Sequence, residues 1–343
     1  MSLDPVQLTR RLVDIESISY NEGAVGAFLA EFLAMQGFAV EKMPVKQHKE
    51  SRSTSERFNV YACVPGQTPD VVLSTHMDTV PPFIPSSEDD AFIYGRGACD
   101  AKGIIAAQIA AAKKLTEQGI RAALLFVVGE ERDSAGAKTA NLHPRGSRFL
   151  INGEPTDNRI ALASKGTLRA AIRASGKMAH SAYPELGESA TQKLVEALHR
   201  ILAIPLPALD DVGPSTLNIG MISGGHAPNV IADHAEAQVM VRLVGSSDET
   251  RRAIEQAAEG LATVDYTLEI PFKRLRAVEG LPTMIAAFTT DIPWLTNWGE
   301  PVLLGPGSIH VAHTPHEKLA KRELQAAIDL YVEVARQLVT SSR

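Results

Sequence analysis

The chain has 343 residues, of which 45% are hydrophobic and 22% charged, and its formal net charge is -6. This length exceeds the size at which a single core normally stops growing, so two domains are expected. The acidic balance and the lack of a Lys/Arg run argue against a nucleic-acid partner, and the two cysteines are too few for a disulfide framework. Because no signal peptide and no bilayer-length apolar run is recognisable, the sequence predicts a soluble cytoplasmic protein without a membrane partner.

Short apolar runs alternate with amphipathic helical patterns through the first half of the chain. Helices are predicted at residues 5–15, 22–38, 101–119 and 134–142. Strands are predicted at residues 58–64, 71–75, 122–129, 148–153 and 160–164. This alternation is typical of an α/β fold with a mixed, mostly parallel sheet flanked by helices, in which ligands bind beyond the carboxyl ends of the strands.

The pattern changes in the middle of the chain. A strand, a helix, two strands, a helix and a strand are predicted, in that order, at residues 166–175, 188–204, 215–225, 234–245, 248–262 and 265–273. The order βαββαβ is that of the ferredoxin-like split unit. The tail then returns to α/β character, with a helix near 283–291, a strand at 301–305 and a final helix at 320–339. The sequence therefore predicts one domain, residues 1–163 and 282–343, interrupted by an inserted module, residues 164–281.

Polar side chains end one of the predicted buried strands. In VVLSTHMDTVPP, residues 71–82, the strand-like run leads into His76 and Asp78. Side chains alternate along an extended chain, so these two are expected to face the same way. A histidine at a strand end is more often a satisfied polar residue than a ligand, so the prediction of a site depends on partners elsewhere.

Three other segments supply carboxylates at comparable positions. Asp100, in YGRGACDAKG, lies in a glycine-bounded turn immediately before a helix, where an N-cap is the plain alternative. Glu130 and Glu131 follow an apolar strand-like run, where an exposed polar loop is the alternative. Glu154 follows another such run and precedes a proline, which repeats the same plan.

Histidines gather near the end of the chain, in LLGPGSIHVAHTPHEKL at residues 303–319. The Gly-Pro-Gly turn and a later proline predict a loop, so at most one ligand is expected among its histidines. The strand-end and loop positions together offer two imidazoles and three carboxylates, from His76, Asp100, Glu131, Glu154 and His313. This mixture suits zinc, with manganese or cobalt as alternatives. Three carboxylates would largely neutralise two divalent ions held roughly 3.5–4 Å apart.

Six segments resemble, in order, the motifs of one known enzyme family: HMDTVPP, YGRGACDAKG, GEERDSAGA, NGEPT, GKMAHSAYPELGESA and GPGSIHVAHTPHE. The family is that of the dizinc amidohydrolases and peptidases, which includes acetylornithine deacetylase, succinyl-diaminopimelate desuccinylase, aminoacylases and glutamate carboxypeptidases. The resemblance spans most of the chain. It implies a zinc-peptidase-like catalytic domain with two Zn²⁺ ions and an inserted lid domain through which a homodimer forms.

The resemblance also implies which residues hold the metals. His76 and Glu154 would bind one ion, Glu131 and His313 the other, and Asp100 would bridge the two. The choice of His313 rests on the match of its neighbours to the family motif, since two other histidines lie close by.

The remaining roles concern catalysis and the substrate. Asp78 matches the residue that orients the ligand histidine. Glu130 matches the general base that takes a proton from the metal-bridging water, so that a hydroxide attacks, and passes the proton to the leaving amine. His180, in the lid, would reach the active site of a partner subunit and polarise the scissile carbonyl. The expected substrate contacts are the side chains of Asn229 and Arg242 and the backbone N–H groups of Gly305 and Gly307. His226 has no expected role.

The activity that the resemblance implies most directly is metal-dependent cleavage of an N-acyl amino acid at its amide bond, as in acetylornithine deacetylase. This activity would belong to amino-acid biosynthesis. Alternatives within the class are a di- or carboxypeptidase on short peptides and a succinyl-diaminopimelate desuccinylase. A non-catalytic binding protein would not explain the complete set of ligands and base. A two-metal phosphatase lacks a phosphate-cradling motif and does not explain the lid.

Overall fold

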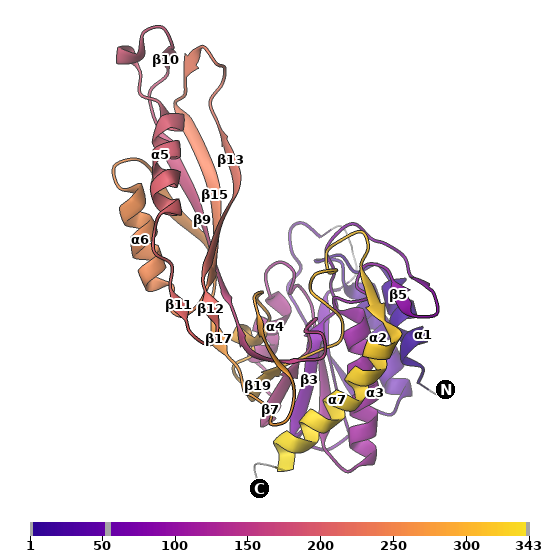
Figure 1. Cartoon of the computed structure of the whole chain (residues 1–343). Coiled ribbons are helices and arrows are strands. Elements are labelled where there is room, and N and C mark those ends of the chain that lie inside the picture. Colours follow the sequence, from indigo (N-terminus) through magenta and orange to yellow (C-terminus); the bar gives the residue numbers. More distant parts are fainter. Residues whose placement is uncertain (1–2, 52–55, 341–343) are drawn as a thin grey trace. The chain divides into compact units, whose positions relative to one another are not determined.

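The computed structural model describes residues 3–51 and 56–340 and shows two compact units (Figure 1). The first unit comprises Met1–Leu162, Leu275–Met284 and Thr290–Arg343. The second comprises Ala163–Arg274 together with the short segment Ile285–Thr289. The inserted unit is therefore built almost entirely from one continuous stretch of chain.

A six-stranded mixed sheet forms the centre of the first unit. Its order is β1 (Ala39–Pro44), β2 (Phe58–Cys63), β6 (Ala122–Val127), β3 (Val71–His76), β7 (Phe149–Asn152) and β19 (Glu300–Leu303). The four strands from β6 to β19 run parallel, and β2 runs antiparallel to both of its neighbours. The predicted mixed, mostly parallel sheet is thus confirmed. The edge strand β1, which is mostly exposed and carries the charged residues Glu41 and Lys42, was not predicted.

Helices cover both faces of this sheet because successive side chains of its strands point to opposite sides. One face packs in a core with helices α1 (Pro5–Val13), α2 (Gly23–Met35), α3 (Lys102–Glu117) and α7 (Lys321–Thr340). On β3, Leu73 belongs to that core, whereas Val72 belongs to the core on the other face, with α4 (Ala135–Asn141) and Trp298. The alternation of the apolar run therefore fixes which face each helix covers.

Helix α3 is packed on all sides, and its composition suits this position. Residues along its first three turns are almost all alanine, glycine or isoleucine, and all are buried. The helix contacts α1, α7, β3 and β6, so it needs small side chains on every side. Only Ala101 lies between Asp100 and the start of this helix, so the packing of α3 holds Asp100 at the carboxyl end of the sheet.

The second unit has the ferredoxin-like order expected from the sequence. Its elements are β9 (Gly166–Ser175), α5 (Ala190–Leu202), β13 (Thr216–Gly224), β15 (His234–Leu243), α6 (Asp248–Ala258) and β16 (Thr263–Ile270). The four strands form an antiparallel sheet in the order β13-β15-β9-β16. Side chains of α5 and α6, such as Leu194 and Ile254, pack with one face of this sheet in a separate core. The predicted βαββαβ module is confirmed.

Shorter elements complete both units. The first unit contains β4 (Ser87–Glu88), β5 (Phe92–Tyr94), β20 (Lys318–Ala320) and a 3-10 turn (Ile292–Trp294). The second contains β10 (Ala179–His180), a 3-10 turn (Pro184–Leu186), β11 (Ala208–Leu209), β12 (Gly213–Pro214) and β14 (Val230–Ile231). A three-stranded sheet has the order β17 (Lys273–Arg274), β8 (Ile160–Ser164) and β18 (Thr283–Ala286). Of the helices formed by residues 3–51 and 56–340, none is long and apolar enough to cross a membrane.

The helix predicted near 283–291 is wrong. The structure has strand β18 there, followed by an irregular segment that ends at Asp291. The backbone N–H groups of Ile160, at the start of β8, and of Lys165, just after its end, donate to the carbonyl oxygens of Pro282 and Ala286. The pairing with β8 outweighs the weak helical pattern, because the β-branched residues in this segment suit a strand.

Candidate active site

The residues predicted to bind metal lie together at the carboxyl ends of the parallel strands of the first unit. His76 ends β3, Glu131 lies in the loop between β6 and α4, and Glu154 follows β7. Asp100 precedes α3, and His313 lies in the loop between β19 and β20. Parallel strands end at one edge of a sheet, so residues far apart in the chain meet there.

These five side chains form two groups that share one aspartate. The first group is His76, Asp100 and Glu154, and the second is Asp100, Glu131 and His313, each with ligand atoms within 4.8 Å of one another. Oδ1 of Asp100 lies 2.9 Å from Nε2 of His76, and Oδ2 lies 3.3 Å from Nε2 of His313. Each carboxylate oxygen of Asp100 therefore faces a different group, as a bridging ligand requires.

Because the cluster is largely buried, its carboxylates are costly to ionise when no cation is bound. Asp100 and Glu154 are only 5% and 4% exposed, and Oε1 of Glu154 has no hydrogen-bond partner among the described residues. Burial raises the pKa of Glu154 well above its ordinary value, and the charges of Asp100 and Glu131 add to this, while His76 opposes it. An unpaired buried carboxylate is costly. The donor set and the orphaned oxygen therefore fit two divalent cations.

The two histidines are held as metal ligands should be. Nδ1 of His76 lies 3.0 Å from the backbone carbonyl oxygen of Asp78, which can only accept a hydrogen bond. Nδ1 therefore carries the proton, and Nε2 is left to face Asp100 and a metal. Nε2 of His313 lies 2.9 Å from Oε1 of Glu131. Hydrogen bonds to Asp100 and Glu131 raise the pKa of His313 to about 10 when no metal competes for this nitrogen.

Asp78 organises the loop that carries the two glutamates. Its carboxylate accepts the backbone N–H groups of Gly129, Glu130 and Glu131, at 3.0, 3.1 and 3.2 Å, and the hydroxyl of Ser19 at 2.7 Å. The carboxylate oxygen Oδ1 lies 3.6 Å from Nδ1 of His76, farther than the carbonyl oxygen of the same residue. Asp78 thus orients His76 mainly through its backbone and fixes the glutamate loop through its side chain.

Glu317 does the same for the turn that carries Asp100, a role that was not predicted from the sequence. Its Oε1 accepts the backbone N–H groups of Gly97, Cys99 and Asp100 at 2.9, 3.1 and 3.1 Å. Its Oε2 accepts a hydrogen bond from the guanidinium of Arg96 at 2.6 Å. Glu317 is buried, and it lies within the histidine-rich loop motif. A carboxylate at the end of that motif was the only signal in the sequence.

Glu130 and Asp291 are two further carboxyl groups at this site. Burial raises the pKa of Glu130 well above its ordinary value, and the charge of Glu154 adds to this. Asp291, which the sequence analysis also missed, is 1% exposed, and burial raises its pKa to about 7. The charge of Asp291 contributes to the raised pKa of both Glu130 and Glu154, so the three groups are close enough to interact.

A cavity of about 540 Å³ lies in the first unit, and none of the five predicted metal ligands lines it. Its lining includes Ser19, whose hydroxyl donates to Asp78, and Arg132, which follows the predicted ligand Glu131. Glu16 and Glu50 also line it. The cavity therefore offers one cation and two carboxylates, and it is linked to the site through Ser19 and Asp78.

Two of the residues predicted to contact substrate lie side by side in the second unit. His180 is in β10 and pairs with Val230 of β14, and the carbonyl oxygen of Asn229 accepts the N–H of Ser181 at 3.0 Å. Both side chains are exposed. Arg242 lies on β15, where its guanidinium donates to the hydroxyl of Thr167 at 2.8 Å.

The two predicted glycines lie in the first unit, in the loop after β19. The N–H of Gly305 donates to the hydroxyl of Thr156 at 2.9 Å, so this donor is already engaged within the protein. Gly307 has a φ of +81°, and a Cβ there would meet Sγ of Cys99 at 2.5 Å. Both features explain why glycine or a tightly held backbone is needed at this turn.

Gly129 provides a test of the glutamate loop. It has a φ of +80°, and a Cβ there would meet the guanidinium of Arg57 at 2.3 Å. Gly119 has a similar φ of +76° but open space around a Cβ. Both Gly→Ala changes should cost about 1 kcal/mol or more of stability for the left-handed backbone. Only Gly129→Ala should also weaken metal binding, measured by equilibrium dialysis, and equal metal affinity in the two variants would contradict the loop's role.

Asp291 should impose a pH dependence on the stability of the metal-free protein. Its pKa in the folded state is about 7, above the ordinary value of 3.8, so the folded state holds a proton that the unfolded state releases. This stabilisation is present below about pH 4 and is lost as pH rises through about 7. Replacing Asp291 by Asn should therefore raise the free energy of unfolding, relative to wild type, by up to about 4 kcal/mol between those limits.

Urea unfolding at about pH 5 and about pH 8, with a chelator present, measures this difference. The matched control is Asp210→Asn, which changes an exposed aspartate of the second unit. A pH-independent difference between Asp291→Asn and wild type would show that Asp291 titrates normally in the folded protein.

Comparison with known proteins agrees with this geometry. Residues 72–337 match the profile described as peptidase family M20/M25/M40. A probable carboxypeptidase of Aspergillus fumigatus is 39% identical over 373 residues, which cover 94% of this chain and 84% of that protein. A tripeptidase of Staphylococcus aureus has a TM-score of 0.79 at 24% identity, covering 97% of this chain and 98% of that one. An M20 family metallo-carboxypeptidase of Sulfolobus solfataricus has a TM-score of 0.75 at 17% identity, covering 98% and 99%. The chain belongs to peptidase family M20/M25/M40.

Proposed function

We propose that this protein is a two-metal peptidase that hydrolyses short peptides, with carboxypeptidase activity as its main reaction. The observation that carries the proposal is the pair of ligand groups that share Asp100, with Glu130 beside them. The similar protein of Aspergillus fumigatus is named a probable carboxypeptidase, and two similar structures are a tripeptidase and a metallo-carboxypeptidase. These names support peptide substrates better than the N-acetylated amino acid expected first from the sequence.

The proposed ligands follow the two groups. His76 and Glu154 hold one ion, Glu131 and His313 hold the other, and Asp100 lies between them. Zinc suits this mixture of imidazole and carboxylate best, with cobalt or manganese as substitutes. When bound, the two ions supply a Lewis acid for the scissile carbonyl and lower the pKa of the attacking water.

Glu130 is the proposed general base. Its carboxylate takes a proton from the attacking water as the oxygen approaches the peptide carbonyl carbon. It then delivers the proton to the nitrogen of the leaving amine, so that the carboxylate is regenerated. Its raised pKa suits both halves of the cycle, because a carboxyl group that is readily protonated can hold the proton between the two transfers.

The substrate is proposed to be held by charged groups on either side of the scissile bond. Arg132, in the cavity of the first unit, is a cation that suits one end of a short peptide. From the sequence resemblance we retain His180, Asn229 and Arg242 as the contributions of the second unit. The backbone N–H of Gly307 completes the proposed set.

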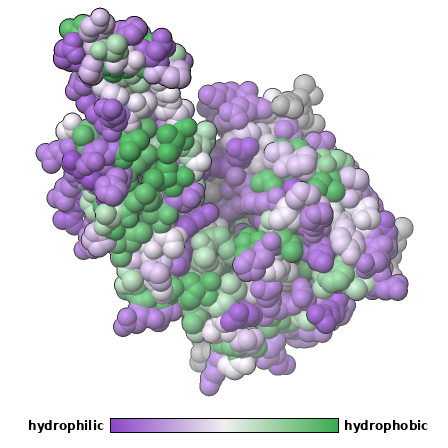
Figure 2. Space-filling model, turned by 45° about the horizontal axis from the view of Figure 1, so that its top comes forward, coloured by the Kyte–Doolittle hydropathy of each residue, from purple (hydrophilic) through white to green (hydrophobic). Residues whose placement is uncertain are grey.

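A homodimer through the second unit is part of the proposal. Strand β13 lies at the edge of its sheet, and Met221 and Ile222 on it are 69% and 64% exposed. Figure 2 shows a hydrophobic area on the surface of this unit. An unpaired edge strand with exposed apolar side chains is a ready template for pairing with a second copy.

The role of Glu130 is tested by replacing it with Gln. The variant should lose about 10²–10⁴-fold in kcat on a dipeptide, because the base is removed while the ligands stay. Its metal content, measured by mass spectrometry after dialysis, should equal that of the wild type. Glu31→Gln, an exposed glutamate on α2, is the matched control and should retain full activity. Unchanged kcat in Glu130→Gln would remove the residue from the mechanism.

The substrate class is tested with zinc-loaded protein on a panel of dipeptides, C-terminally amidated dipeptides and N-acetyl amino acids. We expect cleavage of free dipeptides and loss of rate when the terminal carboxylate is amidated. Faster hydrolysis of N-acetylornithine than of any peptide would instead support the deacylase that the motifs first suggested.

The dimer is tested by analytical ultracentrifugation. The wild type should sediment as a dimer, and Ile222→Glu should shift it toward monomer because it places a charge on the apolar edge. Leu202→Glu changes an equally exposed leucine at the end of α5 and should leave the dimer intact. A fully active wild-type monomer would overturn both the interface and any action of His180 on a partner subunit.

A further inference from the structure

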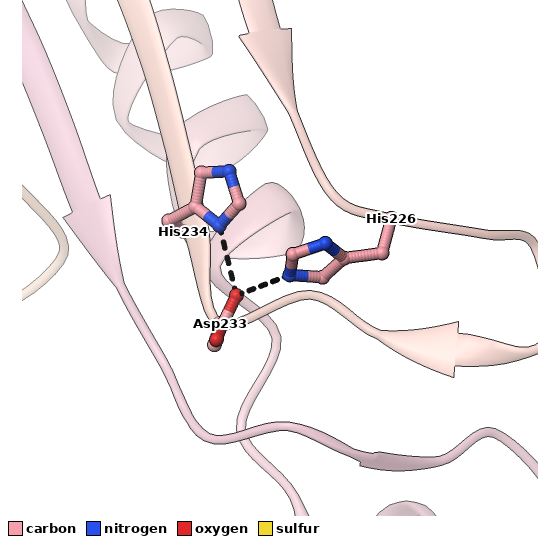
Figure 3. A group of neighbouring side chains, drawn as sticks. All are labelled: His226, Asp233 and His234. Carbon is pink, nitrogen blue, oxygen red and sulfur yellow. Dashed lines mark hydrogen bonds and ion pairs between the residues drawn. The ribbon is translucent and has the colours of Figure 1, made fainter.

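A second set of potential metal ligands lies in the second unit. Figure 3 shows His226, Asp233 and His234 with their side chains pointing toward one another. His226 comes from the segment between β13 and β14, and the other two residues stand at the start of β15. Oδ1 of Asp233 lies 2.9 Å from Nε2 of His226 and 2.8 Å from Nδ1 of His234. All three side chains are accessible to solvent.

We propose that these residues form a third metal site, specific for a transition-metal dication of the zinc type. Two imidazoles and one carboxylate are the donors such ions prefer, whereas calcium and magnesium prefer oxygen alone. Ligand atoms around a tetrahedral zinc ion lie roughly 3.3 Å apart. The observed contacts of 2.8 and 2.9 Å need to open by only about half an ångström to admit it.

The backbone holds the three ligands in this arrangement before any ion binds. The N–H of Gly225 donates to the carbonyl oxygen of His234 at 3.1 Å, and the N–H of Gly176 donates to that of Asp233 at 2.8 Å. Gly224 and Gly225 have φ values of +150° and +74°, which let the chain turn sharply toward His226. A Cβ on Gly224 would meet Ala235 at 2.7 Å. Preorganised ligands lose little further freedom when the ion binds.

Solvent access defines what kind of site this is. Three protein ligands leave one position of a tetrahedral ion for water, and the exposed fractions of 44%, 38% and 62% leave room for it. The site lacks the buried carboxylates of the first unit, so we expect weaker binding and free exchange with metal in solution. An ion here would act on the loop that its ligands flank.

The ion would fasten the loop that carries two of the proposed substrate contacts. His226 and His234 flank residues 227–233, which include Asn229 and strand β14. Val230 of β14 pairs with His180, so a link between the two flanking histidines restrains both. If the proposed function holds, on which this consequence rests, loading the third site should change KM for a dipeptide and leave kcat nearly unchanged.

The site itself is tested by counting bound zinc in the full chain by equilibrium dialysis. The wild type should bind one more ion per chain than His226→Ala and than His234→Ala. The matched control is His199→Ala, an exposed histidine on α5 of the same unit, which should bind as many ions as the wild type. Equal zinc content in all four proteins overturns the third site.

Thermal unfolding gives a second readout that does not depend on activity. Zinc added beyond saturation of the first unit should raise the Tm of wild type and His199→Ala but not of His226→Ala. The same rise in all three proteins contradicts the proposal. If the His226→Ala and His234→Ala variants bind one ion fewer but the wild type has no peptidase activity, the third site is supported and the proposed function is refuted. If the wild type has peptidase activity but binds no more zinc than the variants, the proposed function is supported and the third site is refuted.

Discussion

The active-site architecture depends on two buried carboxylates that capture runs of backbone N–H groups. Asp78 accepts three N–H groups of the loop that carries Glu130 and Glu131, and Glu317 accepts three from the turn that carries Asp100. Each carboxylate balances its buried charge with these donors, and Glu317 has Arg96 as well. The ligands are thereby positioned by hydrogen bonds to the chain itself, and their own oxygens stay available.

The same arrangement leaves buried carboxyl groups whose negative charge bound cations would compensate. Glu154 and Asp291 are buried, Glu130 is half-buried, and loss of contact with water raises the pKa of each. The protein gathers this negative charge at the carboxyl ends of parallel strands, where the helices and loops converge. Because these carboxylates have few positive groups beside them, the site favours the binding of two divalent cations.

That the five candidate ligands lie together could be predicted from the sequence, because each of them ends a local pattern. His76 and Glu154 follow apolar strands, and their meeting follows from parallel pairing of β3 with β7. The supporting residues carry no such local sign. Asp78 lies 51 to 53 positions from the N–H groups it accepts, and Glu317 lies 217 to 220 positions from its own. Such contacts exist only once the sheet has formed. Asp291 was hidden by the mistaken helix at 283–291, and β1 by its charged, exposed face.

Two ions should flank Asp100, and anomalous X-ray diffraction from crystals grown with zinc would locate them. We expect two anomalous peaks roughly 3.5–4 Å apart, one beside His76 and Glu154 and the other beside Glu131 and His313. A single peak, or two peaks that do not share Asp100 as a ligand, would contradict it.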